Sequence, residues 1–332
     1  MLKAWRDGIG RVNRAPAILF GLWITTALVS VPLTLEIRGR IQDHLGASLE
    51  AGSAASDVNY DWLQEFMGQA GGLSRTVTPS VVGFAAVLDN LSALVDATPR
   101  PAVVAAAAAL YVVLLTFFSG GIIDRYARDR AVRAHGFFTV CGVFFFRFLR
   151  LGVLAAAAYG FLFGSFHPWL FDDVYPRLTA DVTSERTAFF TRLGLYLLFG
   201  LPLAVVNLLF DYAKVRAVVE DRRSMIGALA AAGSFVRRNL WSASALYALN
   251  AAAFVGVLAV YRLIAPGVGT AGLSMWLAFG VGQLYVVARL WVKAVFWSSE
   301  TALFQSRLAH AGYVRSPERL WPESPAAEAI AR

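Results

Sequence analysis

Charged residues are scarce in this 332-residue chain: Asp, Glu, Lys and Arg make up 16% of it, and hydrophobic residues make up 58%. Soluble domains carry about 25% charged residues and about 45–50% apolar ones. So few charges leave long stretches without any, and about 18 or more apolar residues in a row are enough to cross a bilayer. The composition therefore argues against an ordinary soluble protein and predicts an all-α, polytopic membrane bundle.

Cysteines and catalytic motifs are also missing. Cys141 is the only cysteine, so the chain has no internal disulfide and no cysteine-based zinc site. It contains no P-loop, H-E-x-x-H, G-x-S-x-G or kinase signature. The four histidines lie far apart in the chain; His167 with Asp172 and Asp173 could form a metal site, and a polar connector is the simpler interpretation of that group. We therefore expect no catalytic residue, no cofactor and no metal, and we do not expect an enzyme.

Six apolar runs are long enough to span a membrane. The start of the third span is ambiguous, because the apolar run 136–166 has Arg147 and Arg150 in its middle. An arginine at the bilayer centre costs about 2.5–3.5 kcal/mol on insertion scales, so we predict a surface helix at 133–147 and a span from 148. The predicted spans are about 16–34, 101–123, 148–166, 189–210, 241–262 and 273–292.

The remaining chain divides into connectors and a tail. Residues 35–100 form the longest connector, which we predict to be external and amphipathic: Ile37 and Ile41 continue the first helix with one apolar face, and two further helices follow. We treat 1–304 as one membrane domain and 305–332 as a polar cytoplasmic tail.

Basic residues give the orientation. The segments 1–15, 124–150, 211–240 and 289–332 hold 22 Lys and Arg residues, and the segments on the other side hold 8. Because Lys and Arg gather in cytoplasmic loops, we predict a multi-pass protein of the inner (plasma) membrane with both termini in the cytoplasm. These basic residues flank apolar runs, so we expect membrane lipids as partners and no nucleic acid.

Three short segments suggest an internal repeat. The even-numbered spans are followed by Arg130-Ala131-Val132, Arg216-Ala217-Val218 and Lys293-Ala294-Val295. Each odd-numbered span is preceded by a candidate cytoplasmic amphipathic helix, as in residues 1–15. The hypothesis is three repeated helical hairpins with their basic segments at the cytoplasmic ends of the even-numbered spans; chance is the alternative, because Ala, Arg and Val are common.

The stretch FDYAKVRAVVEDRR at 210–223, which follows a long apolar helix, resembles uncharacterised bacterial six-span integral membrane proteins. The architecture over about 100–300 is also similar to the membrane domain of some glycerophosphodiester phosphodiesterases. The resemblance implies a helical membrane fold. It implies no phosphodiesterase activity, because the soluble catalytic domain is absent.

Polar residues within the spans are the candidate functional positions, since such residues are costly unless they are paired or functional. They are Asn207, Asn250, Gln283 and Arg289. Hydrogen bonding between helices and the lining of a substrate path are both open interpretations. A second set, at the ends of the spans, has the charge to bind lipid head groups: Arg130, Arg147, Arg150, Arg216, Arg237, Arg238 and Lys293.

These patterns favour a non-enzymatic protein that binds or translocates lipid or another amphipathic molecule. The alternative is a structural or accessory subunit of an envelope membrane complex. In that case the connector 35–100 would be the docking surface for the protein partner.

Overall fold

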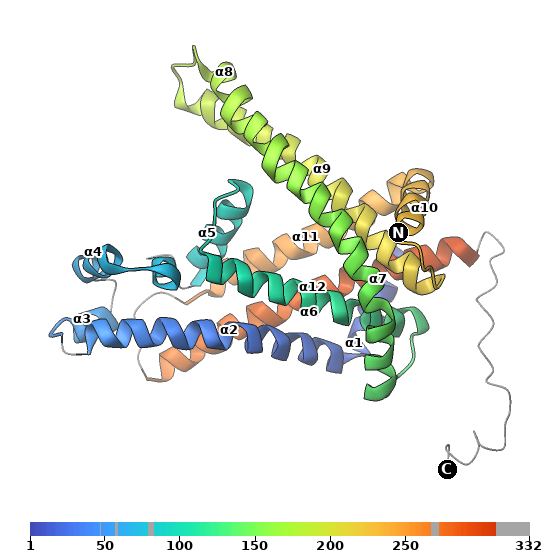
Figure 1. Ribbon diagram of the computed structural model, residues 1–332, viewed down its shortest axis with the longest axis horizontal. Coiled ribbons are helices and arrows are strands. Elements are labelled where there is room, and N and C mark those ends of the chain that lie inside the picture. The colour runs from blue at the N-terminus through green and yellow to red at the C-terminus, as the bar shows by residue number, and fades with distance from the viewer. Residues whose placement is uncertain (47, 57–58, 79–82, 267–271, 310–332) are drawn as a thin grey trace.

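The computed structural model describes residues 1–46, 48–56, 59–78, 83–266 and 272–309, and this part of the chain forms helices and no strand (Figure 1). Six of the helices are long and apolar enough to cross a membrane. Each contains one predicted span, which confirms the all-α, multi-pass class. They are α2 (Pro16–Leu45), α6 (Ala102–Arg128), α7 (Ala134–Phe161, continuing helically to Thr179), α9 (Glu185–Val219), α11 (Leu240–Ile264) and α12 (Leu273–Ala309).

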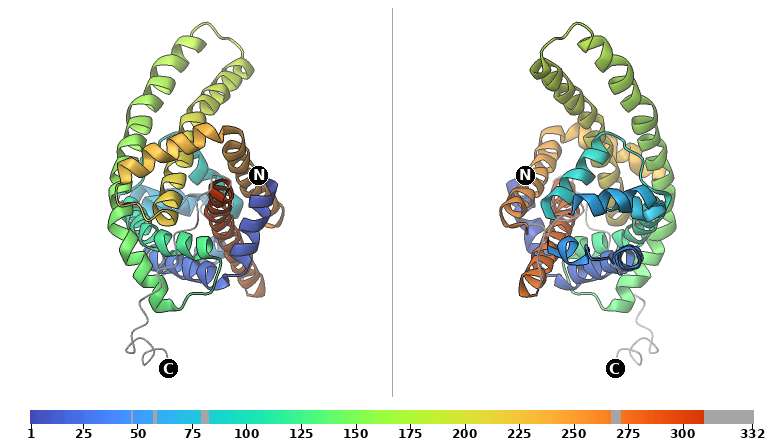
Figure 2. Two further views of the ribbon diagram at one scale, coloured as in Figure 1. Left: turned by 90° about the vertical axis from the view of Figure 1, so that its right-hand side faces the viewer. Right: turned by 90° about the vertical axis from the view of Figure 1, so that its left-hand side faces the viewer.

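Four of these helices, α2, α6, α11 and α12, run alongside one another, and α1 (Leu2–Asn13) lies at one end of the group (Figures 1 and 2). We call this the α1 end; α10 (Met225–Arg238) also lies there. The helices α7 and α9 form a hairpin, which we call the arm, that leans away from the other four as it leaves the α1 end. The arm's outer part contains η2 (Leu162–Phe166), η3 (Trp169–Val174) and α8 (Tyr175–Thr179).

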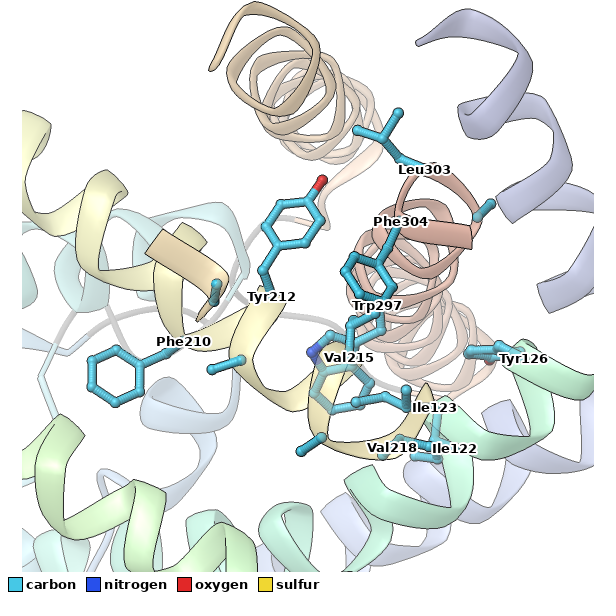
Figure 3. Close-up of a cluster of buried hydrophobic side chains, with 14 of the residues drawn as sticks. Ile122, Ile123, Tyr126, Phe210, Tyr212, Val215, Val218, Trp297, Leu303 and Phe304 are labelled. Carbon is cyan, nitrogen blue, oxygen red and sulfur yellow. The ribbon is translucent and has the colours of Figure 1, made fainter. Parts of the chain in front are cut away.

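The hydrophobic core lies at the α1 end. In each long helix, only 6–22% of the most apolar stretch is buried within the protein. The largest cluster of buried hydrophobic side chains instead combines α1, α10 and the α1-end segments of the long helices. Figure 3 shows part of it, including Val215 of α9 with Trp297 and Phe304 of α12. Lipid-facing apolar surface therefore forms most of each span, and packing holds the helices at one end.

The helix α1 packs against α12 along a face that contains Ala4, Gly8 and Val12. A Cβ atom on Gly8 would lie 2.7 Å from the Cα of Ser299, so only glycine allows this approach. The predicted helix at 1–15 is present, but its apolar side is covered by protein rather than left for lipid. Leu2, at the start of this helix, is 59% exposed.

The predicted division of the third apolar run is wrong. The helix α7 is continuous from Ala134 to Phe161, with no break near 147. The side chain of Arg147 is 15% exposed and forms a 2.7 Å ion pair with Asp221, beyond the end of α9. The insertion cost that motivated the break applies to an arginine facing lipid, and this arginine has an acidic partner just beyond the end of α9.

The connector follows the predicted outline. The helix α2 continues to Leu45, and it is followed by α3 (Ala51–Ser56), α4 (Tyr60–Gln69), η1 (Gly72–Thr76) and α5 (Gly83–Val95). Residues 79–82, within the predicted connector, lie outside the described residues. The helix α12 continues to Ala309, five residues into the predicted tail; residues 310–332 lie outside the described part of the chain.

Candidate functional site

The most concentrated group of buried charges lies between α9 and α12. On α12, Lys293, Trp297 and Glu300 follow one another at intervals of four and three residues, which places them on one face of the helix. Asp211 and Lys214, three residues apart on α9, share a face in the same way. The two helices contact each other. We call Asp211, Lys214, Lys293 and Glu300 the ionic cluster.

The two lysines are the accessible side of the ionic cluster. The Nζ atom of Lys214 lies 2.7 Å from Oδ1 of Asp211, and its side chain is 25% exposed against 7% for Asp211. The Nζ atoms of Lys214 and Lys293 lie 5.9 Å and 5.0 Å from the centroid of the Trp297 ring. Both ammonium groups therefore lie over one indole, where the ring's electrons attract a cation.

Glu300 is the buried side of the ionic cluster. The residue is 1% exposed, and neither carboxylate oxygen has a hydrogen-bond partner among the described residues. The hydroxyl of Tyr212 is also buried without a partner there. Buried polar atoms in folded proteins nearly always have a partner. This group of unpartnered atoms therefore points to a place where a proton or a bound polar group is accommodated.

Polar side chains lead from the lipid-facing helices to the ionic cluster. Asn207 lies one helical turn before Asp211 on α9, is exposed, and accepts a 2.8 Å hydrogen bond from the Tyr159 hydroxyl of α7. Tyr247 of α11 lies next to Asn207 and packs edge-on against Phe296 of α12, with ring centroids 5.4 Å apart. Helices α7, α9 and α11 thus each contribute one polar group at an otherwise apolar surface.

The other predicted intramembrane polar residues lie elsewhere. Asn250 is fully buried; it accepts a 3.0 Å hydrogen bond from Trp5 and donates one of 2.9 Å to Ser299. Gln283 accepts a 2.9 Å hydrogen bond from Trp23. These contacts favour the helix-bonding interpretation for both residues. Arg289 is exposed on α12.

The structure separates the seven predicted head-group-binding residues into three kinds. Arg147 and Arg216 hold the fold together: Arg216 donates to Glu220 at 2.8 Å and to the carbonyl oxygen of Ala231 at 2.7 Å. Lys293 belongs to the ionic cluster. The other four are exposed near the α1 end, at positions suited to contact a membrane surface: Arg130, Arg150, Arg237 and Arg238.

The sequence pattern missed Lys214, Trp297 and Glu300. The spacing of Lys293, Trp297 and Glu300 was visible, but the predicted span ended at 292, so the residues after it were treated as a cytoplasmic segment. A polar face within an apolar helix that continues to Ala309 would have been the correct signal.

The three basic-Ala-Val segments do not occupy equivalent places in their helices. Arg130 follows the end of α6 at Arg128, and Arg216 lies in the last turn of α9. Lys293 precedes the last residue of α12, Ala309, by 16 residues, which is about 24 Å of helix. The prediction concerned depth at the inner membrane boundary, which the helix ends do not locate, so the repeat stays a prediction.

No protein-family model matches this chain, and no curated protein or solved structure matches it either. The resemblance to six-span bacterial membrane proteins stays a prediction.

Proposed function

We propose that this membrane protein binds an amphipathic molecule with an anionic head group, such as a phospholipid, and moves it between environments without chemical change. We place the molecule's acyl chains against the exposed apolar surfaces of α7, α9 and α11, and its head group at the ionic cluster. In this proposal the protein lies in the inner (plasma) membrane, and the α1 end and both termini are cytoplasmic, as the distribution of Lys and Arg favours.

One observation carries the proposal: the half-buried lysines of the ionic cluster lie within a turn or two of exposed polar groups on lipid-facing helices. Asn207 and Tyr159 are hydrogen-bonded to each other at that surface. A polar pair facing hydrocarbon is unfavourable unless something polar passes or binds there. An amphipathic ligand has the matching chemistry, since its head group meets Asn207 and the lysines while its chains stay among apolar side chains.

The anion preference comes from Lys293. Asp211 already pairs with Lys214, whereas Lys293 has no ion pair in the part of the chain that the structure describes. An ammonium group is a common ligand for phosphate, which it contacts as a point charge. A phosphodiester placed over Trp297 would contact Lys293 directly and Lys214 at the far side of the same ring.

Binding is tested with fluorescent phosphatidylglycerol and fluorescent phosphatidylcholine added to the purified full-length protein in detergent. We expect tighter binding of phosphatidylglycerol, and about tenfold weaker binding after Lys293→Gln, the loss of roughly one charge-assisted contact. Arg38→Gln, at an exposed position on α2 outside both the ionic cluster and the predicted head-group-binding set, is the matched control and should change nothing. Equal affinity for the two lipids, with no effect of Lys293→Gln, would overturn the proposal.

A competition arm distinguishes a lipid from a soluble anion. Dimethyl phosphate carries the same phosphodiester charge without acyl chains. We expect it to compete only weakly, because most of the lipid's contact is apolar. Competition by dimethyl phosphate as strong as that by unlabelled phosphatidylglycerol would show that the acyl chains contribute nothing and would refute the lipid assignment.

Movement is measured separately, in liposomes that contain the protein and a lipid reporter quenched only from outside. We expect faster exchange between leaflets than in protein-free liposomes and a rate near background for Lys293→Gln. A wild-type rate equal to that of empty liposomes would reduce the proposal to binding alone.

A further inference from the structure

We propose that Glu300 is a proton-binding site coupled to the ionic cluster, so that an anionic head group enters together with one proton. The inference rests on the proposed binding of an anionic amphipathic molecule. The step it describes is simple: a proton from water joins a carboxylate oxygen of Glu300 when the anion arrives, and it leaves when the anion leaves. No other bond is made or broken.

The first argument is the burial of Glu300. The residue is 1% exposed, and its two carboxylate oxygens have no hydrogen-bond donor among the described residues. An ionised carboxylate in such a place is stable only while nearby positive charge compensates for its lost hydration. Its charge state therefore depends on the state of the lysines more strongly than that of any exposed carboxylate.

The second argument is the balance of charges around Glu300. The charged groups that act on it are Asp211 and Lys214 of α9 and Lys293 of α12. The uncharged hydroxyls of Tyr212 and Tyr247, from α9 and α11, also face it. When both carboxylates are ionised, the two ammonium groups balance them. A bound phosphodiester adds one negative charge, and protonation of one carboxylate restores neutrality.

The third argument identifies which carboxylate takes the proton. Asp211 accepts a direct 2.7 Å contact from the Lys214 ammonium, which favours its ionised form. Glu300 has no such contact and lies deeper. When the anion draws Lys293 away from the carboxylates, Glu300 loses the charge that compensated it, and Asp211 retains its partner. Glu300, rather than Asp211, therefore binds the proton.

The experiment measures binding of phosphatidylglycerol to the full-length protein in detergent between about pH 5 and pH 8. Its phosphodiester keeps a single negative charge over this range, so any pH dependence belongs to the protein. For one coupled proton, we expect the affinity to rise by up to about tenfold for each unit that the pH falls. Calorimetry in two buffers of different ionisation heat should show about one proton taken up per lipid bound.

The test variant is Glu300→Gln, a neutral side chain of the same shape that mimics the protonated acid. It should bind phosphatidylglycerol at high pH as tightly as the wild type does at low pH. Its affinity should not change with pH. Glu185→Gln, at an exposed position at the start of α9, is the matched control and should keep the wild-type slope. A Glu300→Gln protein that retains the slope would overturn the inference.

The outcomes separate the two proposals. If the wild type binds phosphatidylglycerol tightly with no pH dependence and no proton uptake, the coupling is refuted and the proposed function stands. If it does not prefer phosphatidylglycerol to phosphatidylcholine, both fail. If Glu300→Gln does not fold, the wild-type calorimetry still decides, since the absence of proton uptake would refute the coupling by itself.

Discussion

The α1 end and the lipid-facing parts of the same six helices differ most clearly at their glycines. At the α1 end, an added Cβ on Gly8, Gly120 or Gly121 would lie within 2.7 Å of an atom on another helix. In the apolar stretches, an added Cβ on Gly194, Gly200 or Gly256 would meet nothing within 4 Å. Close packing therefore fixes the helices at one end, and over most of their length they present their surfaces to lipid. A protein built in this way can hold one end rigid while its apolar surfaces remain available to a ligand.

The largest expected effect compares a glycine from each region. Gly8→Ala places a methyl group 2.7 Å from the Cα of Ser299, and a backbone atom cannot move aside cheaply. We expect it to destabilise the protein by about 1–3 kcal/mol, the usual cost of overpacking. Gly200→Ala should instead be neutral or stabilise by up to about 1 kcal/mol, because alanine is the better helix former. Thermal unfolding in one detergent measures the stability of both variants. A decrease in unfolding temperature of the same size for Gly8→Ala and Gly200→Ala would contradict the comparison.

The second comparison uses two matched hydrogen bonds between a tryptophan and a side-chain amide. The Trp5–Asn250 bond lies in the buried core at the α1 end, and the Trp23–Gln283 bond lies between α2 and α12 in an apolar stretch. Asn250→Leu leaves the Trp5 indole without its partner in a buried place, at a cost of about 1–3 kcal/mol. Gln283→Leu should cost only about 0.6 kcal/mol, the average for bonds between membrane helices. Unfolding in SDS titrations would measure the stability of both variants. Equal losses of unfolding free energy for Asn250→Leu and Gln283→Leu would contradict the predicted difference.

The arm has a second contact with the rest of the protein, at the end of α5, far along the chain from the α1-end core. Asp96 accepts hydrogen bonds from the Tyr196 hydroxyl and, at 3.1 Å, from Arg192, both on α9. On the other helix of the arm, Nε2 of His167, a buried side chain, lies 2.9 Å from the carbonyl oxygen of Val95. The side chains of Arg192 and Asp96 are 49% and 32% exposed, so their ion pair should be much weaker than the contacts in the core.

The smallest expected loss of stability follows from removing the Asp96 carboxylate at this second contact. The Tyr196 hydroxyl, with smaller contributions from Ser92 and Arg192, lowers the pKa of the Asp96 carboxyl below its ordinary value of 3.8. A lowered pKa means that the contact stabilises the folded state above the ordinary value and is lost as the pH falls through the lowered one. Asp96→Asn should remove about 1 kcal/mol of local stability at neutral pH.

Hydrogen exchange measures this effect at α5. We expect Asp96→Asn to increase exchange over 83–98 about fivefold, the equivalent of about 1 kcal/mol, with no change at the α1 end. Asp43→Asn, at an exposed position on α2, is the control. An unchanged exchange rate in α5 would show that the contact contributes nothing to holding the arm.

Particular residues show how far the sequence could be read. The six spans were predictable because an apolar run of about 20 residues has few alternatives to crossing a bilayer. Asn250 and Gln283 were identified as costly polar residues, and each proved to have a tryptophan partner. The partners themselves, Trp5 and Trp23, could not be predicted, because they are separated from the amides by 245 and 260 residues in the chain.

Sequence alone thus determined the class of this protein, since hydrophobicity acts through composition and run length and needs no knowledge of neighbours. Tertiary structure decided the role of each charge. Arg147 was predicted to end a helix at the surface, yet it lies in a continuous helix because Asp221 pairs with it. Glu300 attracted no notice in the sequence, yet it is buried among Asp211, Lys214 and Lys293. The energy of a charge depends on its distance from other charges and from water, and these distances exist only in the folded chain.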